Sequence, residues 1–100
     1  MDTVIENLVH QQLWTDCKIY NEDANLIRGT PPRKLHPEDA QISSEYVLVS
    51  HMRDSVSVRG YTKTFQSVHD ASRVVHAVIA EDSTIAYYIV YKSLNPPRRN

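Results

Sequence analysis

Apolar residues near the start of the chain recur at helical spacing. They stand three or four positions apart, as in one face of an amphipathic helix, and they are Ile5, Leu8, Val9 and Leu13. Thr3 and Glu6 are separated by the spacing of a capping box, in which each side chain satisfies a backbone N–H at the helix start. The pattern therefore predicts a helix that begins at Thr3 and ends near Trp14–Asp16.

Short β-branched and aromatic runs follow this helix and predict strands. Residues 17–21 and 26–29 are two such runs, and the polar stretch 21–25 between them is typical of a turn. Residues 30–39 contain three prolines, which push the preceding residues out of the helical region and predict a partly extended loop. Residues 45–52 are apolar at almost every position from Tyr46 to Val49 and predict a central strand.

The second half of the chain returns to helical spacing and then to strands. Asp54 or Ser55 can cap a second helix, whose predicted buried face is Val58, Tyr61, Phe65 and Val68. Residues 73–80 and 83–91 predict two strong strands joined by a turn at residues 81–83. Because helices and strands alternate, we expect a single small α/β domain over residues 1–94, with a mixed, largely antiparallel sheet flanked by helices. Residues 95–100 are expected to form a flexible basic tail.

The last predicted strand is apolar on both faces. One face carries Ile85, Tyr87, Ile89 and Tyr91, and the other carries Thr84, Ala86, Tyr88 and Val90. A strand with one face in water alternates apolar and polar residues, so both faces are expected to be covered. Two interpretations remain open at this point. The two predicted helices can each cover one face, or a second chain can pack against the strand through its edge or its apolar face.

Length, charge and cysteine content narrow the class of protein. A chain of 100 residues forms one domain with a small stability margin, and a formal net charge of −1 gives no overall basic field to attract nucleic acid. The one cysteine, Cys17, excludes an internal disulfide and suits the cytosol or nucleus. We expect no signal peptide, no membrane insertion, no metal site and no cofactor.

The chain contains the residue types that a ribonuclease can use without a metal ion. A metal-free ribonuclease can use a tyrosine, a histidine and a lysine, and Tyr61, His76 and Lys92 supply these types. However, Tyr61 falls on the apolar face of the second helix, where a packed ring is expected, and His76 lies in an apolar strand, where a hydrogen-bonded core histidine is expected. Lys92 follows the last strand and is expected to be exposed.

Basic residues form two small groups. Arg28, Arg33 and Lys34 precede or lie in the proline-rich loop, and Arg98 and Arg99 lie in the tail. An RNA backbone could be contacted if the fold brought them together, which leaves a small RNA-binding module as a further alternative. A solvated loop and a solubilising tail explain the same residues.

Several segments resemble the small non-catalytic subunit of the eukaryotic tRNA-splicing endonuclease, most closely its fungal branch. The segments are AVIAEDSTIAYYIV, with the preceding HQQLW, LIRGTPPRKLHPEDAQ and the closing KSLNPPRRN. The resemblance spans most of the chain, whereas residues 50–72 match only in pattern. It implies the fold of the C-terminal domain of archaeal tRNA-intron endonucleases and a heterotetramer of two catalytic and two structural subunits.

The resemblance also implies site residues and partners. The final strand would pair tail to tail with that of a catalytic subunit, through Thr84, Ile85, Ala86, Tyr87, Tyr88, Ile89 and Val90. Glu81 and Asp82 would form an acidic turn directed toward a basic pocket of a partner. The second structural subunit would belong to the same complex, precursor tRNA would be contacted indirectly, and Arg98 and Arg99 are possible RNA contacts. The isolated chain can also form a homodimer through the same edge.

The catalytic subunits of the family carry a Tyr, His and Lys triad, and this chain lacks the long segment that leads from the histidine to the lysine. The resemblance therefore predicts no intrinsic cleavage activity and a non-catalytic, structural role. It implies a nuclear location, with the cytosolic face of the mitochondrial outer membrane as the alternative. A self-sufficient endoribonuclease that uses Tyr61, His76 and Lys92 remains the contrasting hypothesis.

Overall fold

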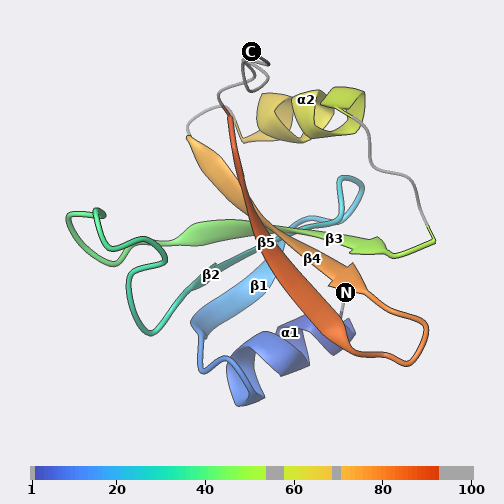
Figure 1. Cartoon of the computed structure of the whole chain (residues 1–100), viewed down its shortest axis with the longest axis horizontal. Helices are drawn as coiled ribbons and strands as arrows, with labels where there is room; N and C mark the ends of the chain where they lie inside the picture. Colours follow the sequence, from blue (N-terminus) through green and yellow to red (C-terminus); the bar gives the residue numbers. More distant parts are fainter. Residues whose placement is uncertain (1, 54–57, 69–70, 93–100) are drawn as a thin grey trace, which may run out of the picture.

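One sheet organises the part of the chain that the structure describes. The computed structural model describes residues 2–53, 58–68 and 71–92, and the elements found there are α1 (Asp2–His10), β1 (Thr15–Asn21), β2 (Leu26–Thr30), β3 (Glu45–His51), α2 (Val58–Ser67), β4 (Arg73–Ile79) and β5 (Ile85–Tyr91). The strands lie in the order β1-β2-β3-β4-β5, so neighbours in sequence are neighbours in space (Figure 1).

The direction of the strands confirms the predicted fold class. β1, β2 and β3 pair antiparallel, as do β4 and β5, whereas β3 and β4 pair parallel. A parallel pair cannot be joined by a tight turn, and α2 lies in the crossover between β3 and β4. The result is a mixed, largely antiparallel sheet with a helix on each side, an α/β fold (Figure 1).

Each face of the sheet has its own hydrophobic cluster. The α1 cluster contains Val4, Leu8, Trp14, Ile27, Val47, Val49, Val75 and Ala77. The α2 cluster contains Leu26, Tyr46, Leu48, Phe65, Val68 and Val74. Neighbouring residues of β2, β3 and β4 alternate between the two clusters, as the two-residue period of a strand requires. This explains why the central strand is apolar at consecutive positions: both of its faces are buried.

The first helix ends earlier than the periodicity predicted. α1 ends at His10 rather than near Trp14–Asp16, and it begins at Asp2, so the predicted cap Thr3 lies inside the first turn. Leu13 has φ of 62°, and the Trp14 N–H donates to the Leu8 carbonyl at 2.8 Å. This left-handed residue reverses the chain at the end of the helix. Leu13 is exposed, whereas Trp14 enters the α1 cluster from the connecting segment.

The strand bounds agree with the predictions to within two residues. β1 begins at Thr15 rather than at residue 17, and β4 ends at Ile79 rather than at residue 80. β5 begins at Ile85, so Thr84 belongs to the turn and not to the strand. The predicted helix caps Asp54 and Ser55 lie outside the described residues, as does the predicted tail 95–100.

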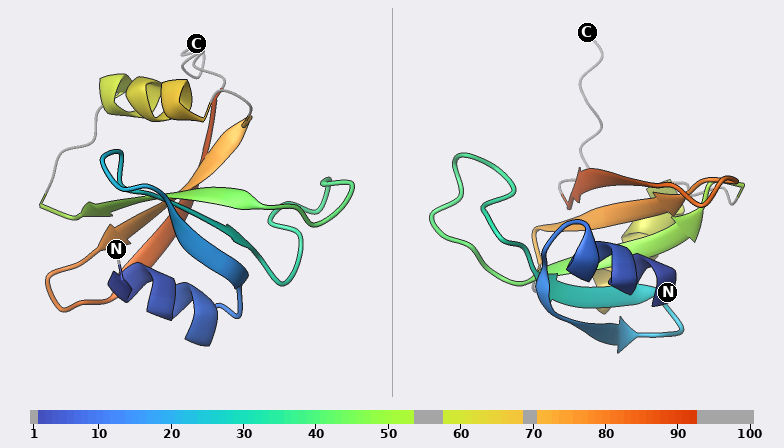
Figure 2. Two further views of the ribbon diagram at one scale, coloured as in Figure 1. Left: turned by 180° about the vertical axis from the view of Figure 1, so that it is seen from behind. Right: turned by 90° about the horizontal axis from the view of Figure 1, so that it is seen from below.

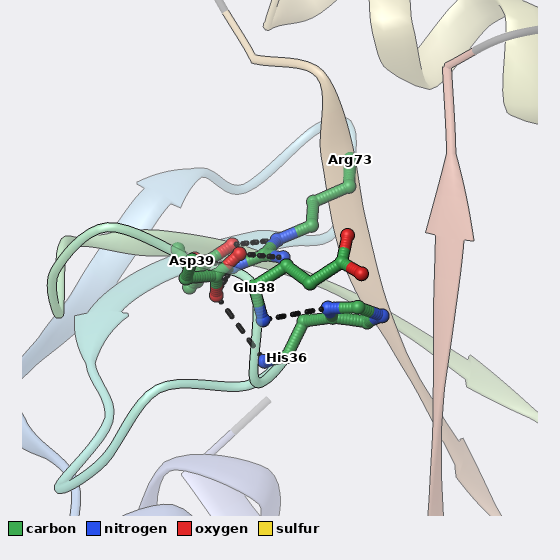
Figure 3. A network of polar contacts seen from close by, with 5 residues as sticks. His36, Glu38, Asp39 and Arg73 are labelled. Atoms are coloured by element: carbon green, nitrogen blue, oxygen red, sulfur yellow. Dashed lines mark hydrogen bonds and ion pairs between the residues drawn. The ribbon is translucent and has the colours of Figure 1, made fainter.

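A polar network fastens the loop between β2 and β3 to the sheet (Figure 3). Arg73 of β4 donates to both carboxylate oxygens of Asp39, at 3.0 and 2.8 Å, and to those of Glu45, at 3.3 and 2.7 Å. The His36 N–H donates to Asp39, and the Glu38 N–H donates to the His36 ring. These contacts give the proline-rich loop a fixed position, although it contains no helix or strand.

Removing the guanidinium is expected to destabilise the fold through the charge it leaves behind. Glu45 is buried, so Arg73→Met leaves a buried carboxylate without its cation, which costs about 3 kcal/mol. The double variant Arg73→Met/Glu45→Gln removes that charge and is expected to recover part of the loss. Urea unfolding of both variants measures this, and equal loss in the two would contradict the explanation.

The same network predicts a dependence of stability on pH. The Arg73 guanidinium holds the pKa of Asp39 below its ordinary value. A carboxylate with a lowered pKa stabilises the fold above its unfolded pKa, about 3.9, and this stabilisation is lost as the pH falls through the folded pKa. Asp39→Asn should therefore lower the unfolding free energy by more at pH 6 than at pH 2.5, as measured by urea titrations at both values. A constant difference would count against this role.

Candidate subunit interface

β5 forms one margin of the sheet and pairs with β4 without interruption. The register runs from Arg73 opposite Tyr91 to Ile79 opposite Ile85. Within the described residues, the outer edge of β5 faces no further strand. Figure 2 shows β5 and β1 at opposite margins of the twisted sheet. A regular edge strand presents unpaired backbone N–H and C=O groups, so this margin is suited to pairing with another strand.

The opposite margin is irregular. The register between β1 and β2 shifts between Thr15 and Lys18 and again between Ile19 and Asn21. Asp16 within the first of these interruptions has φ of 55°, outside the range of a strand. Bulges twist an edge and interrupt its ladder, which makes it a poor template for a further strand. Of the two margins, β5 is therefore the one suited to pairing.

On the face that carries α1, β5 is covered at only one end. Ile85 and Tyr87 are half-buried against the α1 cluster, and the Tyr87 hydroxyl donates to Asn7 Oδ1 at 2.6 Å. Burial is the main reason that the pKa of Tyr87 rises to about 12. Ile89 and Tyr91 lie on the same face beyond α1, and 38% and 48% of their surfaces are exposed.

On the face that carries α2, the opposite end of β5 is covered. Val90 packs against the α2 cluster, whereas Ala86 is exposed and 58% of the surface of Tyr88 is exposed. Tyr88 borders a cleft of about 360 Å³, which is lined by Ser50, His51, Met52, Tyr61, His76 and Val78. The first interpretation of the two-sided strand is thus confirmed in part, because each helix side covers one end of β5. Contact with a second chain stays a prediction, for which the exposed apolar side chains leave room.

The hairpin turn before β5 is built around Asp82. Its Oδ1 accepts from the Thr84 N–H at 3.2 Å and from the Thr84 hydroxyl at 2.7 Å, and these bonds lower the pKa of Asp82. Ser83 has φ of 74°, and its N–H donates to the Ala80 carbonyl at 3.0 Å. A left-handed residue after a tight turn is typical of a three-residue hairpin loop. Glu81 and Asp82 are both exposed at the tip of this hairpin.

The structure brings Tyr61 and His76 together. The Tyr61 hydroxyl lies 2.9 Å from His76 Nδ1, and the Ser50 hydroxyl lies 2.7 Å from His76 Nε2. His76 is buried, which confirms the prediction of a hydrogen-bonded core histidine. Desolvation lowers the pKa of His76 and so favours the neutral imidazole. A neutral imidazole donates through one nitrogen and accepts through the other, and hydroxyl groups satisfy either role. The hydrogen bond between Tyr61 and His76 was not predicted from their spacing.

Lys92 lies away from this pair. His76 stands opposite Tyr88 on β5, and Lys92 follows four residues later, where its N–H donates to the Ser72 carbonyl at 2.7 Å. Because each strand residue adds about 3.3 Å, Lys92 lies about 13 Å along the strand from Tyr88, the residue opposite His76. Tyr61 and His76 are therefore in contact, whereas the backbone of Lys92 stands at the far end of the strand.

The other candidate chemistry is dispersed. Arg28 lies on β2, and Arg33 and Lys34 lie in the loop that follows it, while Arg98 and Arg99 fall outside the described residues. In the portion that the structure describes, no group of three or more His, Cys, Asp or Glu residues is placed to hold a metal ion. None of the helices described there is long and apolar enough to cross a membrane.

Comparison with known proteins supports the resemblance noted from the sequence. The subunit SEN15 of the tRNA-splicing endonuclease from Eremothecium gossypii is 39% identical over 103 residues, which cover 97% of this chain and 87% of that protein. The family described as Sen15 protein matches residues 3–100, so the match includes the β5 margin and the Tyr61–His76 pair as well as the loop. On these two matches, the chain belongs to the Sen15 protein family.

Proposed function

We propose that this chain is a non-catalytic structural subunit of a tRNA-splicing endonuclease. Membership of the Sen15 family supports a role in that complex. The observation that carries the structural role is the β5 margin, which is regular along its length and flanked by exposed apolar side chains. Its contribution to cleavage is positional: it orders a catalytic subunit and, through it, the precursor tRNA.

The proposed contact joins β5 to the final strand of a catalytic subunit. Backbone hydrogen bonds along the open edge would continue the sheet from one subunit into the other, in the manner of strand addition. Tyr88 on one face and Ile89 and Tyr91 on the other would lose their exposed apolar surface in the same contact. Compared with the sequence-based prediction of residues 84–90, the structure favours a paired segment of 85–91, because Thr84 lies in the turn.

The tip of the hairpin between β4 and β5 is a second proposed contact within the complex. Glu81 and Asp82 stand exposed next to the start of β5, and hydrogen bonds from Thr84 hold the Asp82 carboxylate in its ionised form. We propose that this acidic turn faces a basic pocket of a partner in a heterotetramer that includes a second structural subunit. The complex is proposed to act in the nucleus, with the cytosolic face of the mitochondrial outer membrane as the alternative.

The proposed lack of catalysis follows from how the Tyr, His and Lys groups are used. A metal-free ribonuclease needs a base, an acid and a cation that converge on one phosphate. Here both nitrogens of the buried His76 are engaged by Ser50 and Tyr61, and the backbone of Lys92 lies about 13 Å along the strand from the level of His76. This arrangement favours a structural use of the histidine over self-sufficient endoribonuclease activity.

The open edge also supports self-association when no catalytic subunit is present. Two copies of β5 could pair antiparallel about a two-fold axis, because an isologous contact needs only one self-complementary surface. We regard this homodimer as a state of the isolated chain that the catalytic subunit replaces, since both contacts use the same backbone groups.

Charged substitutions on the exposed faces of β5 are expected to prevent assembly. Tyr88→Lys/Ile89→Lys places two charges in the proposed contact, and Tyr87 is avoided because it packs inside this chain. We expect the amount of co-purified catalytic subunit to fall at least tenfold, with the thermal unfolding midpoint nearly unchanged. Ile19→Lys, at a site on the irregular β1 margin whose exposed fraction lies between those of Ile89 and Tyr88, serves as the control and should assemble normally. Normal assembly of the β5 variant would refute the assignment.

Cleavage assays separate the structural subunit from an enzyme. The isolated chain is expected not to cut intron-containing precursor tRNA at the splice sites. In the reconstituted complex, Tyr61→Phe keeps the ring but removes the hydroxyl that contacts His76, and the cleavage rate should change less than twofold. If Tyr61 were an acid or base, the rate would fall roughly 100- to 10,000-fold. Such a fall, with assembly intact, would reverse the conclusion.

A further inference from the structure

Aromatic and cationic side chains gather on the β1–β2 side of the sheet, away from β5. The rings of Tyr20 and Tyr46 meet edge to face with their centroids 4.8 Å apart, and the Arg28 guanidinium lies 5.1 Å from the centroid of the Tyr46 ring. Tyr46 is buried, whereas 45% of the surface of Tyr20 is exposed. The buried ring of Tyr46 thus contacts both Tyr20 and Arg28, whose side chains are exposed at the surface.

Lys18 places a second positive charge in this cluster. The register sets Lys18 directly opposite Arg28, so both side chains leave the same face of the sheet, and both are exposed. Like charges in directly opposed positions destabilise a strand pair. Across residues 2–53, 58–68 and 71–92 the ion pairs are those of Arg73, so no carboxylate there forms an ion pair with Lys18 or Arg28. An anion bound between them would remove the repulsion.

A polar cleft continues from the cluster. Its volume is about 410 Å³, and Arg28 and Tyr46 line it together with Gln41, Ser43 and Ser44. The carboxylates in its wall belong to Asp39 and Glu45, and both are held by Arg73. Hydrogen-bonding groups and space are therefore found next to the paired cations, in a region where the acidic side chains already have a cation.

We propose that Lys18, Tyr20, Arg28 and Tyr46, named here the β1–β2 cluster, bind a single-stranded segment of RNA. A phosphate would lie between Lys18 and Arg28, and a base would stack on the exposed ring of Tyr20. An unpaired base offers a free face for an aromatic ring, whereas a base inside a duplex does not. The choice of RNA rests on the proposed function, but the cluster lies on the margin opposite β5 and can be tested independently of assembly.

Binding to a labelled RNA tests the proposal on the full 100-residue chain. Fluorescence anisotropy with a single-stranded RNA of about ten nucleotides should give an affinity that falls with salt. Two neutralised phosphates predict a slope of about −1.4 in log K against log salt, or roughly sevenfold weaker binding from 50 to 200 mM. Lys18→Ala should bring the slope to about −0.7. Tyr20→Ala should weaken binding roughly fivefold or more, while Tyr20→Phe keeps the stack.

Matched variants and ligands decide the outcome. Arg53→Ala removes an exposed cation beyond the far end of β3 and should leave binding unchanged. Equal weakening in Lys18→Ala and Arg53→Ala, binding of duplex RNA as tight as that of single strands, or no binding at all would each overturn the proposal. Tighter binding of a polyglutamate peptide would overturn it in favour of an acidic protein partner. Tyr20→Ala should still co-purify with the catalytic subunit, so failure of the cluster and failure of the β5 contact are separate results.

Discussion

Both faces of the sheet need to be covered, and the described chain supplies one short helix for each. The helices contain 9 and 10 residues, so each is about 14–15 Å long, whereas the seven residues of β5 span about 23 Å. Ile85 and Tyr87 pack against the α1 cluster, and Val90 packs against the α2 cluster at the other end. The part of β5 that neither cluster covers determines where apolar surface stays exposed, and it lies along the only regular edge of the described sheet.

The interior of the sheet also determines what the polar residues can do. His76 is buried on the face that carries α2, so its ring nitrogens are expected to have hydrogen-bond partners. Ser50 and Tyr61 supply them. Tyrosine and histidine, which a nuclease would direct at its substrate, here form hydrogen bonds within the protein. Arg73 acts similarly on the other face, where its contacts with two carboxylates define the path of the proline-rich loop.

Local patterns were enough to predict most of the fold. The β-branched and aromatic runs of β4 and β5 and the helical spacing of Phe65 and Val68 identified these elements, and their order indicated a mixed sheet. The end of α1 could not be predicted, because Leu13 continues the apolar spacing while its backbone has already turned left-handed. Nothing in the local sequence signals such a turn at a leucine, and the signal comes instead from the burial of Trp14.

The site was less predictable, because its contacts join residues far apart in the sequence. The two-sided apolar character of β5 was readable from the sequence, but which residues remain exposed depends on the length of the helices packed against it. The bond between Tyr61 and His76 depends on how α2 crosses the sheet. The contact of Tyr20 with Tyr46 joins β1 to β3 across β2, so it depends on the strand order and not on the local pattern of β1.

The contrast between the two margins of the sheet limits what can be built from this chain. A molecule with two cohesive edges can add copies indefinitely and grow into a filament. If β5 pairs with another chain as proposed, growth would stop after that one addition, because the outer edge that remains is the irregular β1 edge, whereas β5 has an unbroken ladder. On that proposal, this chain would supply the last strands of the combined sheet and keep the assembly finite.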